Sequence, residues 1–208
     1  MNLTAKEKLN QISKRKDNKS IKEKNLYEAA YELFTTKGIY DTSIDDIVKK
    51  AGVAKGTFYL YFMNKYDIID RIILKKASAI IEKAVKNTED KTLSNYVDLV
   101  ISVIDYIIEY LKENKKLLKL IHKNLSWGLF RKALANPEEF KIMEDIRKFF
   151  ITVIQENNME AEEFETTLFM IIELTGSVCY SAIILQEPAN IDEMKPALFK
   201  MIKKMLAN

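Results

Sequence analysis

The stretch from Ser43 to Lys65, SIDDIVKKAGVAKGTFYLYFMNK, limits the possible folds more than any other part of the chain. Its first half has apolar residues at the i, i+3, i+4, i+7 spacing of one helix face: Ile44, Ile47, Val48 and Ala51. Ser43 precedes this run as a natural N-cap. Gly52 follows it and can take the left-handed conformation in which many helices end. The sequence therefore predicts a short capped helix followed by a tight turn.

A second short helix is predicted directly after this turn, beginning at Val53. Helical spacing places Phe58 and Phe62 together on an inner face and leaves Lys55 and Tyr59 on the outer one. Two short helices joined by such a turn form a helix-turn-helix, whose second helix enters the major groove of DNA. The pattern thus predicts a DNA-binding module.

The wider segment Leu26–Lys65 resembles the DNA-binding domain of the TetR (tetracycline repressor) family. The matching residues are Ala29-Ala30, Leu33-Phe34, Lys37-Gly38, Ser43, Ile47, Ala51-Gly52-Val53, Gly56-Thr57-Phe58-Tyr59, Tyr61-Phe62 and Lys65. Beyond this segment only the helical layout fits the family. The resemblance implies a transcription regulator that acts as a homodimer, and it favours a repressor.

The same resemblance implies which side chains contact DNA. They belong to the recognition helix and its flanks: Ser43, Lys55, Gly56, Thr57, Tyr59, Tyr61 and Lys65. Hydroxyl and phenol groups can donate to phosphate oxygens, and the Lys65 ammonium can add a charge beside the next helix N-terminus. A two-fold dimer presents two recognition helices, so the expected partner is a palindromic double-stranded operator.

Charge is distributed as DNA binding requires. The chain has a net charge of +3, yet residues 1–65 carry 13 Lys and Arg against 8 Asp and Glu. The remaining residues carry 20 against 22. Without a helix-turn-helix, an ordinary solvated lysine-rich surface would be the default interpretation. With one, the basic excess favours a phosphate-binding surface.

An all-α fold is expected, because the 208 residues include only 5 Gly and 3 Pro and show no strand-like alternation. Helices are expected at about 20–37, 64–87, 92–112, 115–134, 138–157, 161–186 and 192–206, besides the two short ones. The expected domains are a basic arm (1–19), the helix-turn-helix domain (20–66), a linking helix (67–87) and a helical ligand-binding and dimerisation domain (88–208).

A small-molecule effector is expected to bind among the apolar helices of the last domain. The candidate lining residues are aromatic or flexible, with one acid: Tyr96, Tyr106, Tyr110, Trp127, Phe130, Phe149, Phe169, Met170 and Glu173. Such a lining suits a lipophilic drug, dye or acyl compound. For any one of these residues, plain core packing is the alternative interpretation.

The apolar run Thr166–Leu185 is long enough to cross a bilayer, but it contains Glu173 and lacks basic flanks. A dimer helix is the favoured interpretation, and no membrane partner is expected. The family architecture implies an interface built from the last two helices. Its candidate residues are Thr175, Cys179, Ala182, Met194, Leu198, Met201 and Met205.

Catalysis is not expected. The chain has one Cys and one His, and its sequence contains no phosphate-binding glycine loop. We therefore expect no metal and no cofactor.

The charged N-terminus is unlike a signal peptide, which favours a cytoplasmic protein. Two alternatives stay open: a DNA-binding regulator controlled by a protein partner with no small-molecule effector, and an enzyme or scaffold that has borrowed the fold.

Overall fold

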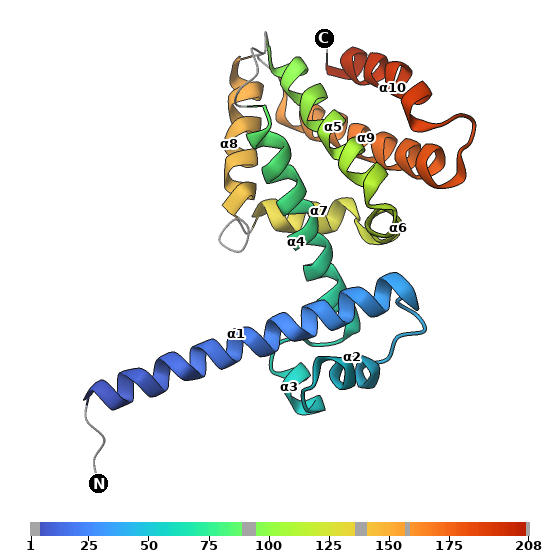
Figure 1. Ribbon diagram of the computed structural model, residues 1–208. Helices are drawn as coiled ribbons and strands as arrows, with labels where there is room; N and C mark the ends of the chain where they lie inside the picture. Colours follow the sequence, from blue (N-terminus) through green and yellow to red (C-terminus); the bar gives the residue numbers. More distant parts are fainter. Residues whose placement is uncertain (1–4, 89–94, 136–140, 157–158, 207–208) are drawn as a thin grey trace. The chain divides into compact units, whose positions relative to one another are not determined.

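A computed structural model describes residues 5–88, 95–135, 141–156 and 159–206 (Figure 1). These residues form helices and connecting turns without a strand, so the predicted all-α fold is confirmed. The helices are α1 (Ala5–Thr36), α2 (Ile44–Ala51), α3 (Lys55–Tyr59), α4 (Lys65–Lys86), α5 (Tyr96–Glu113), α6 (Lys115–Asn124), α7 (Trp127–Ala135), α8 (Lys141–Glu156), α9 (Ala161–Cys179), the π-helix η1 (Tyr180–Leu185) and α10 (Ile191–Leu206).

The chain divides into two compact units, which we call the N-terminal unit (Met1–Ile72) and the C-terminal unit (Ile73–Asn208). The division falls inside α4, so this helix contributes residues to both. The helix-turn-helix lies wholly in the N-terminal unit. The expected domain boundaries at 66 and 87 remain predictions.

Helix α1 is longer than the sequence suggested. It begins at Ala5 and continues without interruption to Thr36, so the expected helix start near Ser20 is wrong. The physical reason is composition: no Gly or Pro interrupts residues 5–36, and Lys, Glu, Leu and Gln all favour helix. The described helix therefore absorbs most of the segment that we predicted as a separate basic arm.

The N-terminal unit is held together by a small aromatic and aliphatic core. Phe58 and Phe62 are buried, as predicted, together with Leu26 of α1 and Ile47 of α2. The ring of Phe62 meets that of Tyr27 edge to face, with centroids 5.3 Å apart. Each such buried side chain contributes about 1.5–3 kcal/mol through removal from water. This core fixes which face of α3 points outward.

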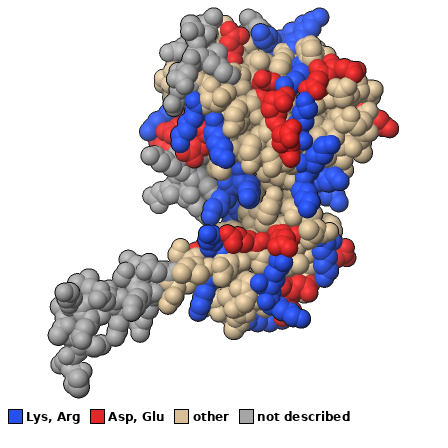
Figure 2. Space-filling model, viewed as in Figure 1, with Lys and Arg blue, Asp and Glu red and all other residues tan. Residues whose placement is uncertain are grey.

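The polar edge of α5 is the seam along which α10 packs. Lys112 of α5 lies 2.7 Å from Asp192, and Asp98 pairs with Lys203 at 3.6 Å. Between them, the ammonium of Lys195 contacts two acidic residues of α5, Asp105 and Glu109. The hydrogen bond from Lys112 lowers the pKa of Asp192 below its usual range. On the face of the C-terminal unit that Figure 2 shows, acidic and basic side chains are interspersed.

The helix expected at 115–134 is two helices in the structure. Helix α6 ends at Asn124 and α7 begins at Trp127. The break lies at Ser126, whose hydroxyl accepts a hydrogen bond from the Leu129 backbone N–H at 3.2 Å. A serine that caps the next helix in this way competes with helix continuation. The expectation of one helix missed this cap.

Helix α9 and η1 together are apolar and lightly covered. The segment Ala161–Leu185 has a mean hydropathy of 2.0 and could span a membrane by length and composition, with 22% of its most apolar window buried. One such helix is weak evidence for a membrane, because packed helices of other proteins meet the same test. Its exposed large apolar residues are Phe169, Met170 and Leu185.

Candidate nucleic-acid interface

The first helix of the motif is capped at both ends, as predicted. The Ser43 hydroxyl accepts from the Asp46 backbone N–H at 3.1 Å, and the Ser43 N–H donates to the Asp46 carboxylate at 3.0 Å. This is a capping box. Lys37 also donates to that carboxylate, and these hydrogen bonds hold the pKa of Asp46 well below its usual range. Gly52 ends the helix at φ +67°, in the left-handed region.

Burial of Phe58 orients the recognition helix α3. On a helix, the positions two residues before and two after a buried residue point almost directly away from it. These are Gly56, the second residue of α3, and Leu60, its C-cap residue, which lie one turn apart on the outward face. Leu60 is 79% exposed and Tyr59 is 53% exposed. A Cβ added at Gly56 would meet no atom of the chain within 4 Å.

Lys55, at the start of α3, is paired with Asp45 of α2. Their charged atoms lie 2.9 Å apart and both side chains are more than half exposed. The hydrogen bond with Asp45 raises the pKa of Lys55. An exposed pair of this kind is weak, because water solvates both charges. We therefore expect Lys55 to be able to leave Asp45 for a DNA phosphate or base.

The Lys65 ammonium binds backbone carbonyl oxygens of the protein. It donates to the carbonyl oxygens of Ile39, Tyr40 and Thr42 at 2.9, 3.2 and 3.2 Å. An ammonium has three donors, so these bonds use all of them. The prediction that Lys65 donates to a DNA phosphate does not fit this geometry. The side chain instead holds the α1–α2 loop against the start of α4, although its charge still adds to the local potential.

Tyr61 also differs from its predicted role. Its phenol donates to the Lys19 carbonyl oxygen of α1 at 3.0 Å, and the Lys19 ammonium lies 5.9 Å from its ring centre. Burial raises the pKa of Tyr61. The phenol therefore ties α3 to α1 in this structure and is not directed outward. The two members of the set that remain, Ser43 and Thr57, lie at the N-cap of α2 and within α3.

Replacement of Lys65 by Met is expected to lower the free energy of unfolding by about 1–3 kcal/mol, because three carbonyl oxygens lose a charged donor. Chemical denaturation of the full chain would measure the change. Lys55→Met is the matched control, since its partner is exposed, and it should leave stability unchanged while weakening DNA binding. Equal stability of the Lys65 variant and the unaltered chain would contradict the proposed loop-holding role.

The structure brings together three of the predicted effector residues. Trp127 of α7 stacks on Phe130 with ring centres 5.5 Å apart and meets Phe169 of α9 at 5.6 Å. Phe130 is buried, whereas Phe169 is 38% exposed. Trp127 and Phe169 line an open surface hollow together with Arg131, Glu162, Glu165 and Thr166. These three aromatic residues are the part of the predicted effector site whose members contact one another in the structure.

The other predicted effector residues are dispersed. Met170 and Glu173 are exposed on α9, so they do not line an enclosed cavity within this chain. The phenol of Tyr96 donates to the Leu206 carbonyl and thereby joins the ends of α5 and α10. The remaining three are partly buried: Tyr106, Tyr110 (beneath the Lys83 ammonium at 5.7 Å) and Phe149 (6.1 Å from Phe150).

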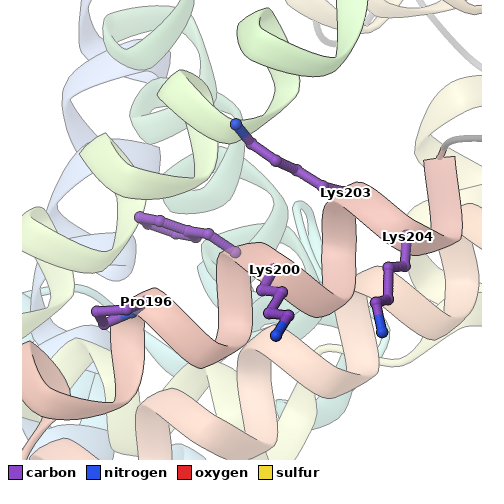
Figure 3. Close-up of a pocket in the computed structure, with 5 residues that line it drawn as sticks. Pro196, Lys200, Lys203 and Lys204 are labelled. Atoms are coloured by element: carbon purple, nitrogen blue, oxygen red, sulfur yellow. The ribbon is translucent and has the colours of Figure 1, made fainter.

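A second hollow lies along α10. It is lined by Pro196, Phe199 and three lysines, Lys200, Lys203 and Lys204. Figure 3 shows Lys200 and Lys204 extending to one side of α10, while Lys203 extends to the other. The lysines therefore do not converge on one point, and the hollow contains none of the predicted effector residues.

Three of the predicted dimer residues are buried inside a single chain. Cys179 and Ala182 have exposures of 0% and 1%, and Leu198 has 4%. They cannot present surface to a partner, so this part of the prediction is wrong: the small residues let α10 and neighbouring helices approach α9 within one subunit. Thr175, Met194 and Met205 are partly covered, and Met201 is exposed.

Two buried hydroxyl oxygens lack a hydrogen-bond partner among the described residues: those of Ser78 on α4 and Thr175 on α9. A buried hydroxyl without a partner costs free energy, so such groups are rare unless they serve a bound molecule or ordered water. No motif predicts these two hydroxyl groups, because a lone Ser or Thr in an apolar helix has no sequence signature. Leu60 was also missed, although its position four residues after Gly56 would have placed it on the outward face.

Residues 26–72 match the family model described as bacterial regulatory proteins, tetR family. An uncharacterized HTH-type transcriptional regulator of Bacillus subtilis, YdgC, is 29% identical over 147 residues, which cover 67% of this chain and 65% of that protein. The chain thus matches slightly less than two thirds of this relative's length. An HTH-type regulator of Staphylococcus aureus (strain USA300) is 29% identical over 64% of this chain and 71% of its own length.

Solved structures show the same fold. A tetR family transcription regulator from Shewanella sp. PV-4 has a TM-score of 0.66 at 15% identity, covering 87% of this chain and 95% of its own. FadR from Bacillus subtilis, crystallised with stearoyl-CoA, has a TM-score of 0.61 at 20% identity, covering 86% and 97%. The matched proteins are transcription regulators and not enzymes. The capped helix-turn-helix and the match over residues 26–72 together show that this segment is a DNA-binding domain of the TetR family.

Proposed function

We propose that this protein is a ligand-responsive repressor that binds a palindromic operator as a homodimer. The observation that carries the proposal is the outward face of α3, where Gly56 and Leu60 lie exposed on a helix that Phe58 anchors and a capped α2 supports. A rigid helix presented in this way fits the major groove. Lys55, Thr57 and Tyr59 flank the face, and Ser43 remains a phosphate donor at the α2 N-terminus.

Selection of binding sites from random duplex DNA would test this proposal. The expected site is a palindrome with half-sites about 34–36 Å, or a multiple of this, apart. Affinity should fall steeply with salt because Lys and Arg displace counterions from phosphates. A selected site without two-fold symmetry, or no binding at low salt, would contradict the proposal.

The proposed homodimer uses the outward faces of α9, η1 and α10. Phe169, Met170 and Leu185 are 38–52% exposed on the first two, and Met201 is 49% exposed on the third. A subunit interface would bury the apolar side chains that remain exposed on the most apolar helix of one chain. This surface replaces the buried residues in the interface predicted from the sequence.

The proposed effector is a lipophilic acyl compound. Support comes from the aromatic content of α5–α9 and from the fold shared with FadR, which was crystallised with stearoyl-CoA. Addition of stearoyl-CoA, with free CoA as control, should release the protein from its operator. Reciprocity requires that operator DNA weaken acyl-CoA binding by the same factor. Independent binding of the two would instead favour control by a protein partner.

Thr175 offers a test of where the effector's polar group binds. Replacement by Val preserves shape and removes a buried hydroxyl that lacks a partner, so the free energy of unfolding should rise by about 1 kcal/mol. If the hydroxyl bonds the effector, effector affinity should fall about fivefold or more in the same variant. Thermal denaturation and isothermal titration would measure the two changes. A rise in stability with unchanged effector affinity would show that Thr175 does not contact the ligand.

A further inference from the structure

We infer that Leu60 reads the methyl groups of thymines, and that the operator carries thymine where the C-terminal end of α3 meets the major groove. The inference rests on the proposed DNA binding and adds a base preference to it. Leu60, the C-cap residue of α3, is 79% exposed, and helical spacing directs it away from the buried Phe58. Leu60 follows Thr57 and Tyr59, two of the proposed DNA contacts, so it offers an apolar contact at the edge of that surface.

Gly56 lets Leu60 reach the bases. It lies one helical turn before Leu60 on the same face, and the space around its Cα is open. With no side chain there, the helix axis can approach the groove floor more closely. The leucine side chain then extends toward the base edges beside the open position at Gly56.

The chemistry of the groove identifies the base. Segment 53–62, VAKGTFYLYF, contains no Arg, Asn or Gln, the side chains that read guanine and adenine by paired hydrogen bonds. Lys55 can read guanine, but it lies at the start of the helix beside Asp45. The thymine methyl is the apolar group that the major groove offers. Contact of the leucine with any other base edge would remove water from hydrogen-bond donors or acceptors of the base. The leucine could not replace those hydrogen bonds.

Replacement of single thymines by deoxyuridine removes only the methyl group and tests the inference on the operator selected with the full-length protein. One buried methyl corresponds to about a fourfold change in affinity, so substitution in both half-sites should cost about fifteenfold. The sensitive thymines should occupy symmetry-related positions. Deoxyuridine outside the half-sites should change nothing.

Variants assign the effect to Leu60. L60A should bind the thymine and deoxyuridine operators equally, whereas L60M, which keeps an apolar side chain, should still distinguish them. I151A is the control, because Ile151 is an exposed apolar residue of the C-terminal unit, and it should behave as the unaltered chain does. Circular dichroism would verify folding.

The outcomes separate the two proposals. Failure of the unaltered chain to bind any duplex would contradict the DNA-binding function itself. Binding to a half-site without thymine, or a methyl effect that persists in full in L60A, would overturn the role of Leu60 and leave the DNA-binding proposal intact.

Discussion

Replacement of Cys179 by Arg is expected to unfold the C-terminal unit, whereas replacement of Met170 by Arg should leave it folded but monomeric. Cys179 has no exposed surface, and burial raises the pKa of its thiol to about 12, so it remains a neutral, packed group. An arginine there would bury an unpaired charge near Lys195, which bears the same sign. An uncompensated buried charge costs about 3–5 kcal/mol, which reaches the lower end of the about 5–15 kcal/mol by which folded proteins are stable.

Met170 lies on the same helix but is 44% exposed. An arginine at this position can remain in water in the monomer, so folding should be preserved while the proposed apolar interface is lost. Sedimentation and circular dichroism would distinguish the two results. Ile151→Arg is the matched control, since Ile151 is equally exposed at 44% on α8 and should leave the dimer intact. An intact dimer of the Met170 variant would show that the interface lies elsewhere.

The local motif was predictable because its signals are local. Ser43, Gly52 and the spacing of Phe58 and Phe62 each act on backbone within a few residues, and the structure has the cap, the turn and the buried face that they predict. The same reasoning failed for α1 because nothing in residues 5–36 stops a helix. A helix end needs a reason in the sequence, and the boundary expected near Ser20 had none.

Partners distant in the sequence were not predictable. Lys65 and the carbonyl of Ile39 are 26 residues apart, and Tyr61 and Lys19 are 42 apart, so no spacing rule connects them. The pattern of small residues around Cys179 correctly indicated close helix packing. It could not tell packing within a chain from packing between chains, because both bury the same small side chains. The exposed fraction of each side chain in the folded subunit distinguishes packing within a chain from packing between chains.

Substitution of Gly56 is expected to change stability and DNA binding in opposite directions. Glycine in a helix costs about 0.5–1 kcal/mol relative to alanine, and an added Cβ meets no atom of the chain within 4 Å. Gly56→Ala and Gly56→Leu should therefore both raise the free energy of unfolding. If position 56 served only the stability of the fold, alanine would be the better residue there.

The proposed reason for glycine is the DNA. A side chain at position 56 would hold α3 away from the groove floor, and it would also remove Leu60 from contact with the bases. Operator affinity should fall modestly for Gly56→Ala and by about 100-fold or more for Gly56→Leu, approaching the non-specific level. Non-specific binding, which depends on phosphate contacts, should change little. Fluorescence anisotropy with operator and scrambled duplexes, beside thermal denaturation, would measure all three quantities. If Gly56→Leu bound the operator normally, the centre of α3 would not be the surface that meets the bases.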